Sequence, residues 1–378
     1  MTKVYCIGCG VVTPVGNSPE TVLAAVREGR TALRLYQDTP EPYMASLLSR
    51  EGFSGPSFLE HIARQAAWSA IVAAGIDPAG PRVGLVLSTI KGNVEQIGQA
   101  DVSLAASANR LAQALGVKTA PLVVSNACIS GLAALLQGMR MIRSGDYDHV
   151  IVIGAEVQSR FIVTGFQSLK ALSLEPCKPF DAARDGLNLG EAAAAMVLSA
   201  TPHSAAEIYC SDSFPKNQFS ATNAWELVSG AVRNDANHIS GPSRTGEGSY
   251  NALRCVLKGV DPEELAFVNV HGTATRYNDQ MEAIALNRAG LQNVPVNALK
   301  GVFGHTMGAA GILESILSMY ACDAGIILPT QGFSQMGVDP AVNVSEQERK
   351  TDKMAFVKLL SGFGGVNGAL LFRKGGAQ

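Results

Sequence analysis

Apolar and polar positions alternate along the chain in blocks that predict strands and helices in turn. Short apolar runs such as RVGLVLST (82–89) and HVIVIGAE (149–156) have the length and branched side chains of buried strands. A longer segment, FLEHIARQAAWSAIVAAG (58–75), has the length of a helix and ends in glycine. Alternation of strands with helices indicates an α/β fold with largely parallel pairing.

The same pattern continues to the end of the chain. The polar, irregular segment from Phe214 to Asn237 is predicted to be an exposed insertion. Further strands are expected at 4–12, 121–125, 191–199, 206–213, 266–272 and 294–300 and on both sides of GFGG (362–365), and further helices at 18–29, 249–259, 279–290 and 307–325.

The two parts of the chain resemble each other. In each, a residue of reactive type precedes a helix rich in small apolar residues, NACISGLAALL (126–136) and GHTMGAAGILESI (304–316). A helix that is apolar on most of its faces belongs between layers rather than at the surface. We therefore predict a duplicated molecule, with halves 1–202 and 203–378 and two buried central helices.

Composition narrows the class of protein. With 378 residues, 47% hydrophobic and only 16% charged, the chain can bury a large core, which argues against disorder. The net charge of −2 provides no general attraction for nucleic acid. No apolar run reaches the ~18–20 residues that span a bilayer, so we expect a soluble, cytoplasmic protein.

The seven cysteines are scattered and odd in number, which favours a reducing compartment. Cys6 and Cys9 form a CxxC pair inside an apolar strand. Because no second pair or nearby histidine completes a metal site, we expect them to be packing residues.

Cys128 occupies the junction between the strand at 121–125 and the following helix. A small buried hydrophobe would suit this position. A thiol at a helix N-terminus is also near free N–H groups and the positive end of the helix dipole, which favour a thiolate and can hold an oxyanion. Ser125, Ser130 and Gly131 leave room for a substrate.

His271 and His305 each follow a predicted buried strand and precede a loop of small residues. A neutral imidazole in such a place can donate a proton to a developing enolate or accept one. Lys300 is predicted to end a strand five residues before His305. Glu314, inside an apolar helix, needs a partner if it is buried.

Other polar and glycine-rich positions have ordinary explanations. Asp279 and Glu282 begin a helix and are expected to be helix-end charges, with Asp279 as structural support. His61, His149, His203 and His238 are expected on surfaces or in loops. GFGGVNG (362–368) lies between two strands instead of a strand and a helix, which argues against a dinucleotide site and favours the wall of a pocket.

Taken together, these motifs resemble the elongating β-ketoacyl-[acyl carrier protein] synthases of the thiolase-fold superfamily. The resemblance extends over nearly the whole chain. The motifs that carry it, in chain order, are NACISG, GFQSLKALS, CKPFDAARDGLNLGEAAAAMVL, VHGTATRYND, KGVFGHTMGAAGILE and SGFGGVNGALLF.

The resemblance implies a five-layer αβαβα fold built from two duplicated halves, and usually a dimer. It implies that Cys128 is the nucleophile, that His271 and His305 are the other catalytic residues, and that Lys300 and Glu314 support them. The oxyanion hole would use the N–H groups of Cys128 and Phe363, and Phe363 would also be a gate. Thr273 and Thr275 would contact the phosphopantetheine arm of the substrate, and Gly364 would also bind substrate.

The implied reaction is a decarboxylative condensation of an acyl thioester with malonyl carrier protein, with no metal or organic cofactor of its own. The implied partners are an acyl carrier protein and a second subunit, either a copy of the chain or a ketosynthase-like mate. Lys170, in GFQSLKALS, is a candidate for docking the acidic carrier.

Several positions depart from the pattern of the family. The stretch from Ile90 to Val117 is shorter than usual, and the segment from Phe214 to Asn237 is longer. Asn126, Ile129 and Ser361 replace more common residues. These differences favour a specialised synthase, for example one that makes polyenes or related secondary lipids.

Three other classes of protein share parts of this pattern. A non-catalytic chain-length partner typically lacks the nucleophile or a histidine, whereas this chain keeps Cys128, His271, His305 and Lys300. A degradative thiolase expects a second catalytic cysteine near the C-terminus, and no cysteine follows Cys322. An initiating synthase has asparagine where His305 stands. The sequence therefore predicts an active condensing enzyme, with the chain-length partner as the alternative.

Overall fold

A ten-stranded mixed sheet runs through the molecule, and its two halves have the same topology. The computed structural model describes residues 2–202 and 224–375. The strand order is β11-β10-β14-β15-β9-β1-β8-β6-β4-β5. In the first half β4 is parallel to β5 and β6, and β8 is antiparallel to β6 and β1. In the second half β10 is parallel to β11 and β14, and β15 is antiparallel to β14 and β9. The duplication predicted from the sequence is therefore present in the fold.

The halves join where β1 pairs with β9 over two residue positions, Tyr5 with Glu226 and Cys6 with Trp225. The strands of the first half are β1 (Tyr5–Val12), β4 (Val83–Ser88), β5 (Leu122–Val124), β6 (His149–Glu156) and β8 (Ala192–Ser199). Those of the second are β9 (Trp225–Asn234), β10 (Phe267–Asn269), β11 (Val296–Asn297), β14 (Ala355–Gly362) and β15 (Val366–Lys374). Smaller sheets contain β2 (Arg34–Tyr36), β3 (Tyr43–Ser46) and β7 (Leu189–Gly190), and β12 (Ile326–Ile327) and β13 (Arg349–Lys350).

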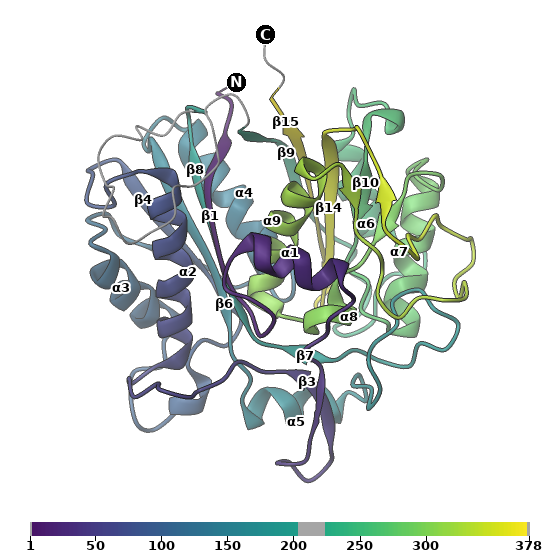
Figure 1. Cartoon of the computed structure of the whole chain (residues 1–378), viewed down its shortest axis with the longest axis horizontal. Coiled ribbons are helices and arrows are strands. Elements are labelled where there is room, and N and C mark those ends of the chain that lie inside the picture. Colours follow the sequence, from purple (N-terminus) through teal and green to yellow (C-terminus); the bar gives the residue numbers. More distant parts are fainter. Residues whose placement is uncertain (1, 203–223, 376–378) are drawn as a thin grey trace.

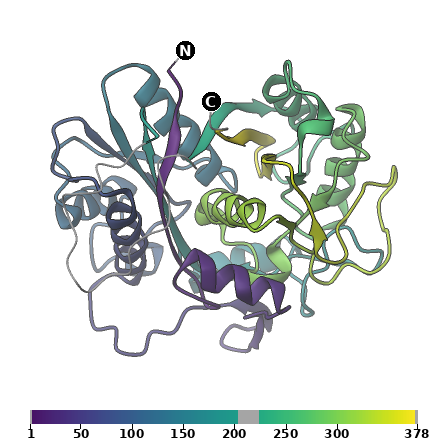
Figure 2. The same ribbon diagram turned by 45° about the horizontal axis from the view of Figure 1, so that its top comes forward.

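Helices and sheet stack in five layers, as the resemblance implied (Figures 1 and 2). Helices α2 and α3 cover the outer face of the first half, α6 and α7 cover the outer face of the second, and α4 and α9 lie between the two halves. The helices are α1 (Pro19–Arg27), α2 (Phe58–Ala74), α3 (Leu104–Leu115), α4 (Ser130–Arg143), α5 (Arg160–Ser168), α6 (Glu247–Val256), α7 (Arg276–Arg288), α8 (Lys300–Phe303) and α9 (Ala310–Asp323), with 3₁₀ turns at Val94–Gln96, Pro262–Glu264 and Met307–Ala309.

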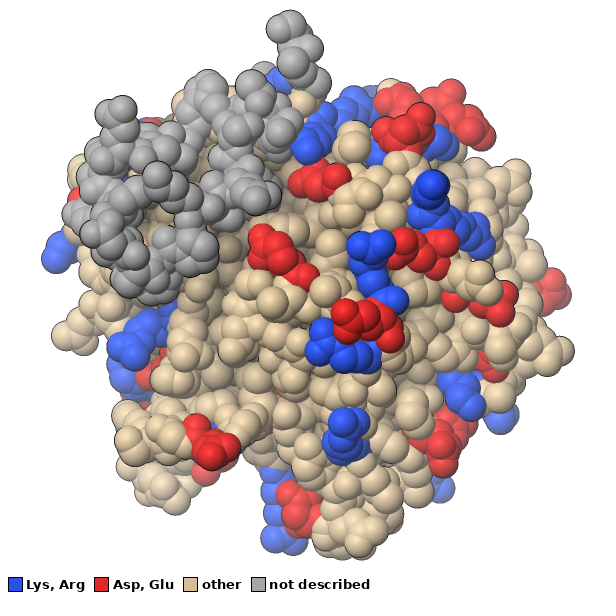
Figure 3. All heavy atoms as spheres, viewed as in Figure 1, with Lys and Arg blue, Asp and Glu red and all other residues tan. Residues whose placement is uncertain are grey.

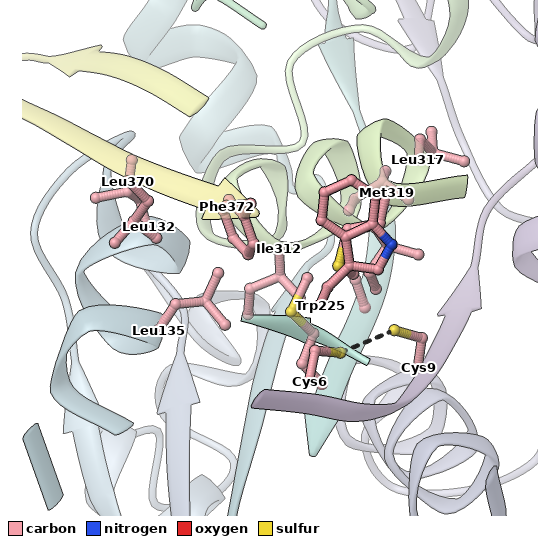
Figure 4. Packing of buried hydrophobic residues seen from close by; sticks show 14 of the residues in the cluster. Cys6, Cys9, Leu132, Leu135, Trp225, Ile312, Leu317, Met319, Leu370 and Phe372 are labelled. Carbon is pink, nitrogen blue, oxygen red and sulfur yellow. Dashed lines mark hydrogen bonds between the residues drawn. The ribbon is translucent and has the colours of Figure 1, made fainter. Parts of the chain in front are cut away.

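Three large apolar clusters separate these layers, and the middle one surrounds α4 and α9. Figure 4 shows side chains of α4 and α9 meeting those of β1, β9 and β15 in this middle cluster. Cys6 and Cys9 belong to it, because a bulge between Cys6 and Gly8 turns both side chains to one face. Their sulfur atoms are 3.4 Å apart and both residues are buried in this cluster, as expected of packing residues.

Helices α4 and α9 cross closely at glycine residues. A Cβ atom on Gly311 would lie 2.3 Å from the backbone nitrogen of Leu132, and one on Gly131 would lie 2.8 Å from the carbonyl oxygen of Gly308. Real Cβ atoms do not approach other heavy atoms this closely, so only glycine fits. The crossing brings together the N-terminal ends of the two helices, which carry Cys128 and His305 just before them.

Two predictions about local structure are wrong. Much of the segment from Phe214 to Asn237 is β9, a central strand whose Trp225 is fully buried; its outer positions are half-exposed, which gave the segment its polar character. Lys300 does not end a strand but begins the short helix α8, because β11 stops at Asn297. The predicted strand at 206–213 and residues 214–223 lie outside the described residues, and the proposed division at residue 202 stays a prediction.

The surface carries both signs of charge. On the face seen in Figure 3, lysine and arginine are interspersed with aspartate and glutamate over a largely uncharged surface. Across the described residues, every helix is too short or too polar to cross a membrane.

Candidate functional site

Cys128 lies in a tight turn between β5 and α4. The preceding Ala127 has a left-handed φ of 46°, a conformation that is unusual for a residue with a side chain. Ser130 stabilises the turn, since its Oγ accepts the N–H of Asn126 at 2.7 Å and donates to the carbonyl oxygen of Ala127. The turn buries Cys128 to 7% exposure and points it toward the second half of the molecule.

The acidity of Cys128 differs from the expectation. Burial raises the pKa of the thiol to about 11, although the charge of Lys300 and the backbone N–H groups of Phe363 and Cys128 lower it. The helix N-terminus therefore does not keep a thiolate at neutral pH, because removal of water outweighs the favourable field. The two N–H groups that act on the thiol are those predicted to form the oxyanion hole.

His271 and His305 meet Cys128 at the boundary between the halves. The candidate ligand atoms of the three residues all lie within 4.8 Å of one another, and the two imidazole rings are 5.0 Å apart and nearly perpendicular. Burial, followed by the charge of Lys300, lowers the pKa of both histidines well below their ordinary value, so both are neutral at pH 7.

The backbone selects one tautomer of His305. Its Nδ1 accepts the N–H of Met307 at 3.3 Å, so the proton must be on Nε2. Nε2 is buried and has no partner among the described residues, which leaves it available as a hydrogen-bond donor. Nδ1 of His271 also lacks a partner.

A buried charge network lies behind the histidines. Lys300 donates to the carbonyl oxygen of His271 at 2.6 Å and to Glu314 at 2.9 Å. Lys358, from β14, donates to the other oxygen of Glu314 and to Asn269. Burial would raise the pKa of Glu314, but the two lysines together hold it below its ordinary value; burial lowers that of Lys358 to about 8.

Lys358 was not predicted from the sequence. The signal was a lysine inside an otherwise apolar strand, AFVKLLSG, where an unpaired charge would be costly. Glu314 thus has the partner that its position required, and a second one as well.

Two acidic residues of α7 hold the loop that carries His271. Glu282 accepts the N–H groups of His271 at 2.7 Å and Gly272 at 2.8 Å, and Asp279 accepts those of Thr273 at 3.0 Å and Phe180 at 2.8 Å. Both carboxyl groups are fully buried, and burial raises their pKa to about 7 and about 6. Asp279 lies in the first turn of α7, as expected, but Asp279 and Glu282 are more than helix-end charges, because the loop turns back over the start of α7 and both carboxyl groups bind it.

A pocket of about 490 Å³ opens onto the three residues. Thr273 and Thr275 line it, and their hydroxyl groups are 2.9 Å apart. Phe363 lines it from the turn between β14 and β15, is 37% exposed, and lies 5.9 Å from the ring of Phe166. Lys170 also lies along this pocket.

Gly364 lies in the same turn as Phe363, with a left-handed φ of 84°. Its N–H donates to the carbonyl oxygen of Ile239 at 2.7 Å, and its own carbonyl oxygen accepts from Asn234. These contacts tie the turn to the loop after β9. That loop places His238 at the pocket. The sequence predicted only that His238 lies on a surface or in a loop.

One cysteine and two histidines are also a possible ligand set for a transition metal such as zinc. His305 could offer only Nε2, because Nδ1 is bound by Met307. The same arrangement also suits a thiol nucleophile with two histidines. The three groups are close together, a pocket lies in front of them, and a tight turn holds Cys128.

These features are typical of a condensing enzyme with a thiolase-like fold. The chain matches two family models, "Beta-ketoacyl synthase, N-terminal domain" over residues 57–203 and "Beta-ketoacyl synthase, C-terminal domain" over residues 225–334. It belongs to the β-ketoacyl synthase family.

Curated relatives agree with this assignment. The chain is 34% identical over 280 residues to 3-oxoacyl-[acyl-carrier-protein] synthase 2 of Vibrio cholerae, which covers 68% of this chain and 63% of the relative. It is 30% identical to a putative mitochondrial 3-oxoacyl-[acyl-carrier-protein] synthase of Schizosaccharomyces pombe, over 71% of this chain and 64% of that one. The matched region thus spans slightly less than two thirds of the length of these relatives.

Solved structures match over almost the full chain. A β-ketoacyl synthase from Burkholderia phymatum has a TM-score of 0.86 at 26% identity and covers 99% of this chain and 100% of its own. A ketosynthase in complex with its chain length factor from Xenorhabdus doucetiae has a TM-score of 0.82 at 24% identity, over 99% and 98% of the two chains, and shares the fold.

Proposed function

We propose that this protein is a β-ketoacyl-[acyl carrier protein] synthase that joins an acyl group to a malonyl unit. The observation that carries the proposal is the meeting of Cys128, His271 and His305 within 4.8 Å at a pocket of about 490 Å³. A nucleophile, two neutral imidazoles and space for a substrate arm are the parts that a thioester condensation requires.

The first step transfers the acyl group to the enzyme. The sulfur of Cys128 attacks the carbonyl carbon of an acyl thioester, and the C–S bond to the carrier breaks. The proton of the Cys128 thiol ends on the released carrier thiol, with a neutral imidazole as the intermediate acceptor. The N–H groups of Cys128 and Phe363, which already act on the thiol, stabilise the oxyanion.

The second step uses a malonyl thioester. Nε2–H of His305, together with His271, donates to the thioester oxygen while the carboxylate leaves as CO₂. The resulting carbanion attacks the acyl carbon on Cys128 and expels the thiolate, which takes up a proton. The product is a 3-ketoacyl thioester two carbons longer, and Cys128 returns to its starting state.

The remaining roles follow from position. Thr273, Thr275 and Gly364 would contact the phosphopantetheine arm and thioester, and Phe363, at the pocket beside Phe166, would act as the gate. Lys300 would keep His271 and His305 neutral through its charge, while Glu314 and Asp279 act as structural supports.

The proposed partners are an acyl carrier protein and a second subunit. Lys170 along the pocket is the proposed docking residue for the acidic carrier. Two solved structures with the same fold are of a ketosynthase with a chain length factor. We therefore propose either a homodimer or a heterodimer with a ketosynthase-like subunit, acting in fatty acid or polyene and polyketide synthesis. A cytoplasmic location is part of this proposal.

Intact-mass measurement with a panel of acyl carrier proteins tests the function. We expect Cys128 to gain the mass of the acyl group, and Cys128→Gln to gain none while still releasing CO₂ from malonyl carrier protein. A properly folded wild-type protein that accepts no acyl group, alone or with a partner subunit, would contradict the proposal and favour a chain-length partner.

A further inference from the structure

Glu156, the last residue of β6, is a buried carboxylate that the proposed chemistry does not use. One carboxylate oxygen accepts from the hydroxyl of Thr89 at 3.1 Å and the N–H of Lys91 at 3.3 Å. The other accepts from the N–H of Ile90 at 2.9 Å and the N–H of Gly308 at 3.1 Å. Three of these donors belong to the loop after β4, whereas Gly308 belongs to the second half of the molecule.

Both backbone polar groups of Gly308, its N–H and its carbonyl oxygen, are hydrogen-bonded to the first half of the molecule. Glu156 accepts its N–H, and the hydroxyl of Ser88 donates to its carbonyl oxygen at 2.7 Å. A Cβ atom on Gly308 would lie 2.7 Å from the carboxylate of Glu156 and 2.8 Å from Cα of Thr89, so the fit leaves no room for movement toward the first half. β4 and β6 thus fix the turn that leads from His305 into α9.

The conformation of this turn determines the hydrogen bond to His305. Met307 has a left-handed φ of 44°, which costs energy for a residue with a side chain and persists only where neighbouring contacts enforce it. In this conformation its N–H reaches Nδ1 of His305 at 3.3 Å. The peptide that follows Met307 is the one whose N–H is bound by Glu156.

We propose that Glu156, assisted by Ser88, is a positioning residue that sets the tautomer of His305. By holding Gly308, it keeps the N–H of Met307 on Nδ1 and the proton of the imidazole on Nε2, where a donor to the substrate oxygen is needed. Its catalytic consequence rests on the proposed function, but the tautomer itself does not. Burial raises the pKa of Glu156 to about 7, while its four hydrogen-bond donors favour the charged form. That form suits this position because both carboxylate oxygens accept, whereas an amide offers one acceptor oxygen.

The test measures the tautomer directly. The ¹⁵N resonances of histidine-labelled protein distinguish a protonated from an unprotonated ring nitrogen, and His305→Asn assigns the signal. In the wild type we expect an unprotonated Nδ1 and a protonated Nε2. In Glu156→Gln and Ser88→Ala we expect both resonances to move toward the average of the two tautomers. We also expect kcat for condensation to fall ~10-fold while KM changes less. This loss is part of the ~10²–10³-fold contribution to kcat that one preorganised hydrogen-bond donor supplies.

Glu282→Gln is the matched control, because Glu282 is an equally buried carboxylate that accepts the N–H groups of His271 and Gly272 instead. It should shift the resonances of His271 and leave the tautomer of His305 unchanged. Unshifted His305 resonances in folded Glu156→Gln and Ser88→Ala would overturn the inference, as would a wild-type proton on Nδ1. If Glu156→Gln does not fold, Ser88→Ala decides. If the wild-type protein has no condensing activity, the proposed function is refuted. The ¹⁵N resonances of His305 would still show whether Glu156 sets its tautomer.

Discussion

At the scale of single residues, Cys128 experiences opposing effects on its acidity. Burial raises its pKa to about 11, and the nearby charge of Lys300 is the main influence in the other direction. At neutral pH the group is therefore a thiol, and the proposed reaction must remove its proton as the sulfur attacks. Of the two neutral histidines beside it, His271 is the one able to accept that proton, because His305 already carries a proton on Nε2 and its Nδ1 is bound by Met307.

This acidity predicts how alkylation of Cys128 by iodoacetamide depends on pH. Since only the thiolate reacts, the rate should rise ~10-fold per pH unit from pH 7 to 10 without a plateau. Lys300→Met should slow the reaction at each pH, because loss of the positive charge raises the pKa further. The protein should carry serine at Cys255, which is exposed, and at Cys210. A plateau below pH 8 would contradict the expectation.

At the scale of elements, the crossing of α4 and α9 sets the distance between the nucleophile and His305. The prediction concerns Gly311, whose Cβ would lie 2.3 Å from backbone. Gly311→Ala should lower the free energy of unfolding by about 3 kcal/mol, because backbone cannot move aside as a side-chain end can. Urea denaturation measures the change. Gly165→Ala, in α5 with open space around its Cβ, is the control and should be neutral or slightly stabilising.

Glu314 connects α9 with α8 and β14 through two lysines. Removing its charge leaves two buried cations together, whereas removing Lys358 leaves a neutral pair of Lys300 and Glu314. We therefore expect Glu314→Gln to destabilise the protein by about 3–5 kcal/mol and Lys358→Met by less. Denaturant unfolding of both variants tests the ranking, and the reverse order would show that Lys358 carries more of the network than its contacts indicate.

At the scale of the whole molecule, the site is assembled by both halves. The first half supplies Cys128, Glu156 and Ser88, and the second supplies both histidines and the turn with Phe363. Neither half contains Cys128 and both histidines, so the proposed activity depends on the packing between the halves.

The mouth of the pocket offers a prediction about the carrier protein. Lys170 and Arg276 both line the pocket and are exposed. Lys170→Glu with Arg276→Glu should raise KM for an acidic carrier ~10-fold and weaken its dependence on salt, while kcat changes little. Lys258→Glu, an exposed charge reversal outside the pocket, is the control. Equal KM values for the double variant and the control would contradict docking at this surface.

Much of this organisation follows from local sequence. The apolar runs at β4, β6 and β8 and the capped helices α1 and α2 were predictable, because burial and capping are recorded in neighbouring residues. So was the duplication, since two similar apolar helices follow two reactive-type residues. β9 was missed because its half-exposed face dilutes the apolar pattern.

The sequence by itself determined which residues could react and in which kind of fold. Only the tertiary structure decided their state: that Cys128 is a thiol, that Lys358 shares Glu314, that Asp279 and Glu282 hold a loop, and that Glu156 reaches Gly308. The physical reason is that pKa and tautomer depend on burial and on donors brought together from distant parts of the chain, and Glu156 and Gly308 are 152 positions apart.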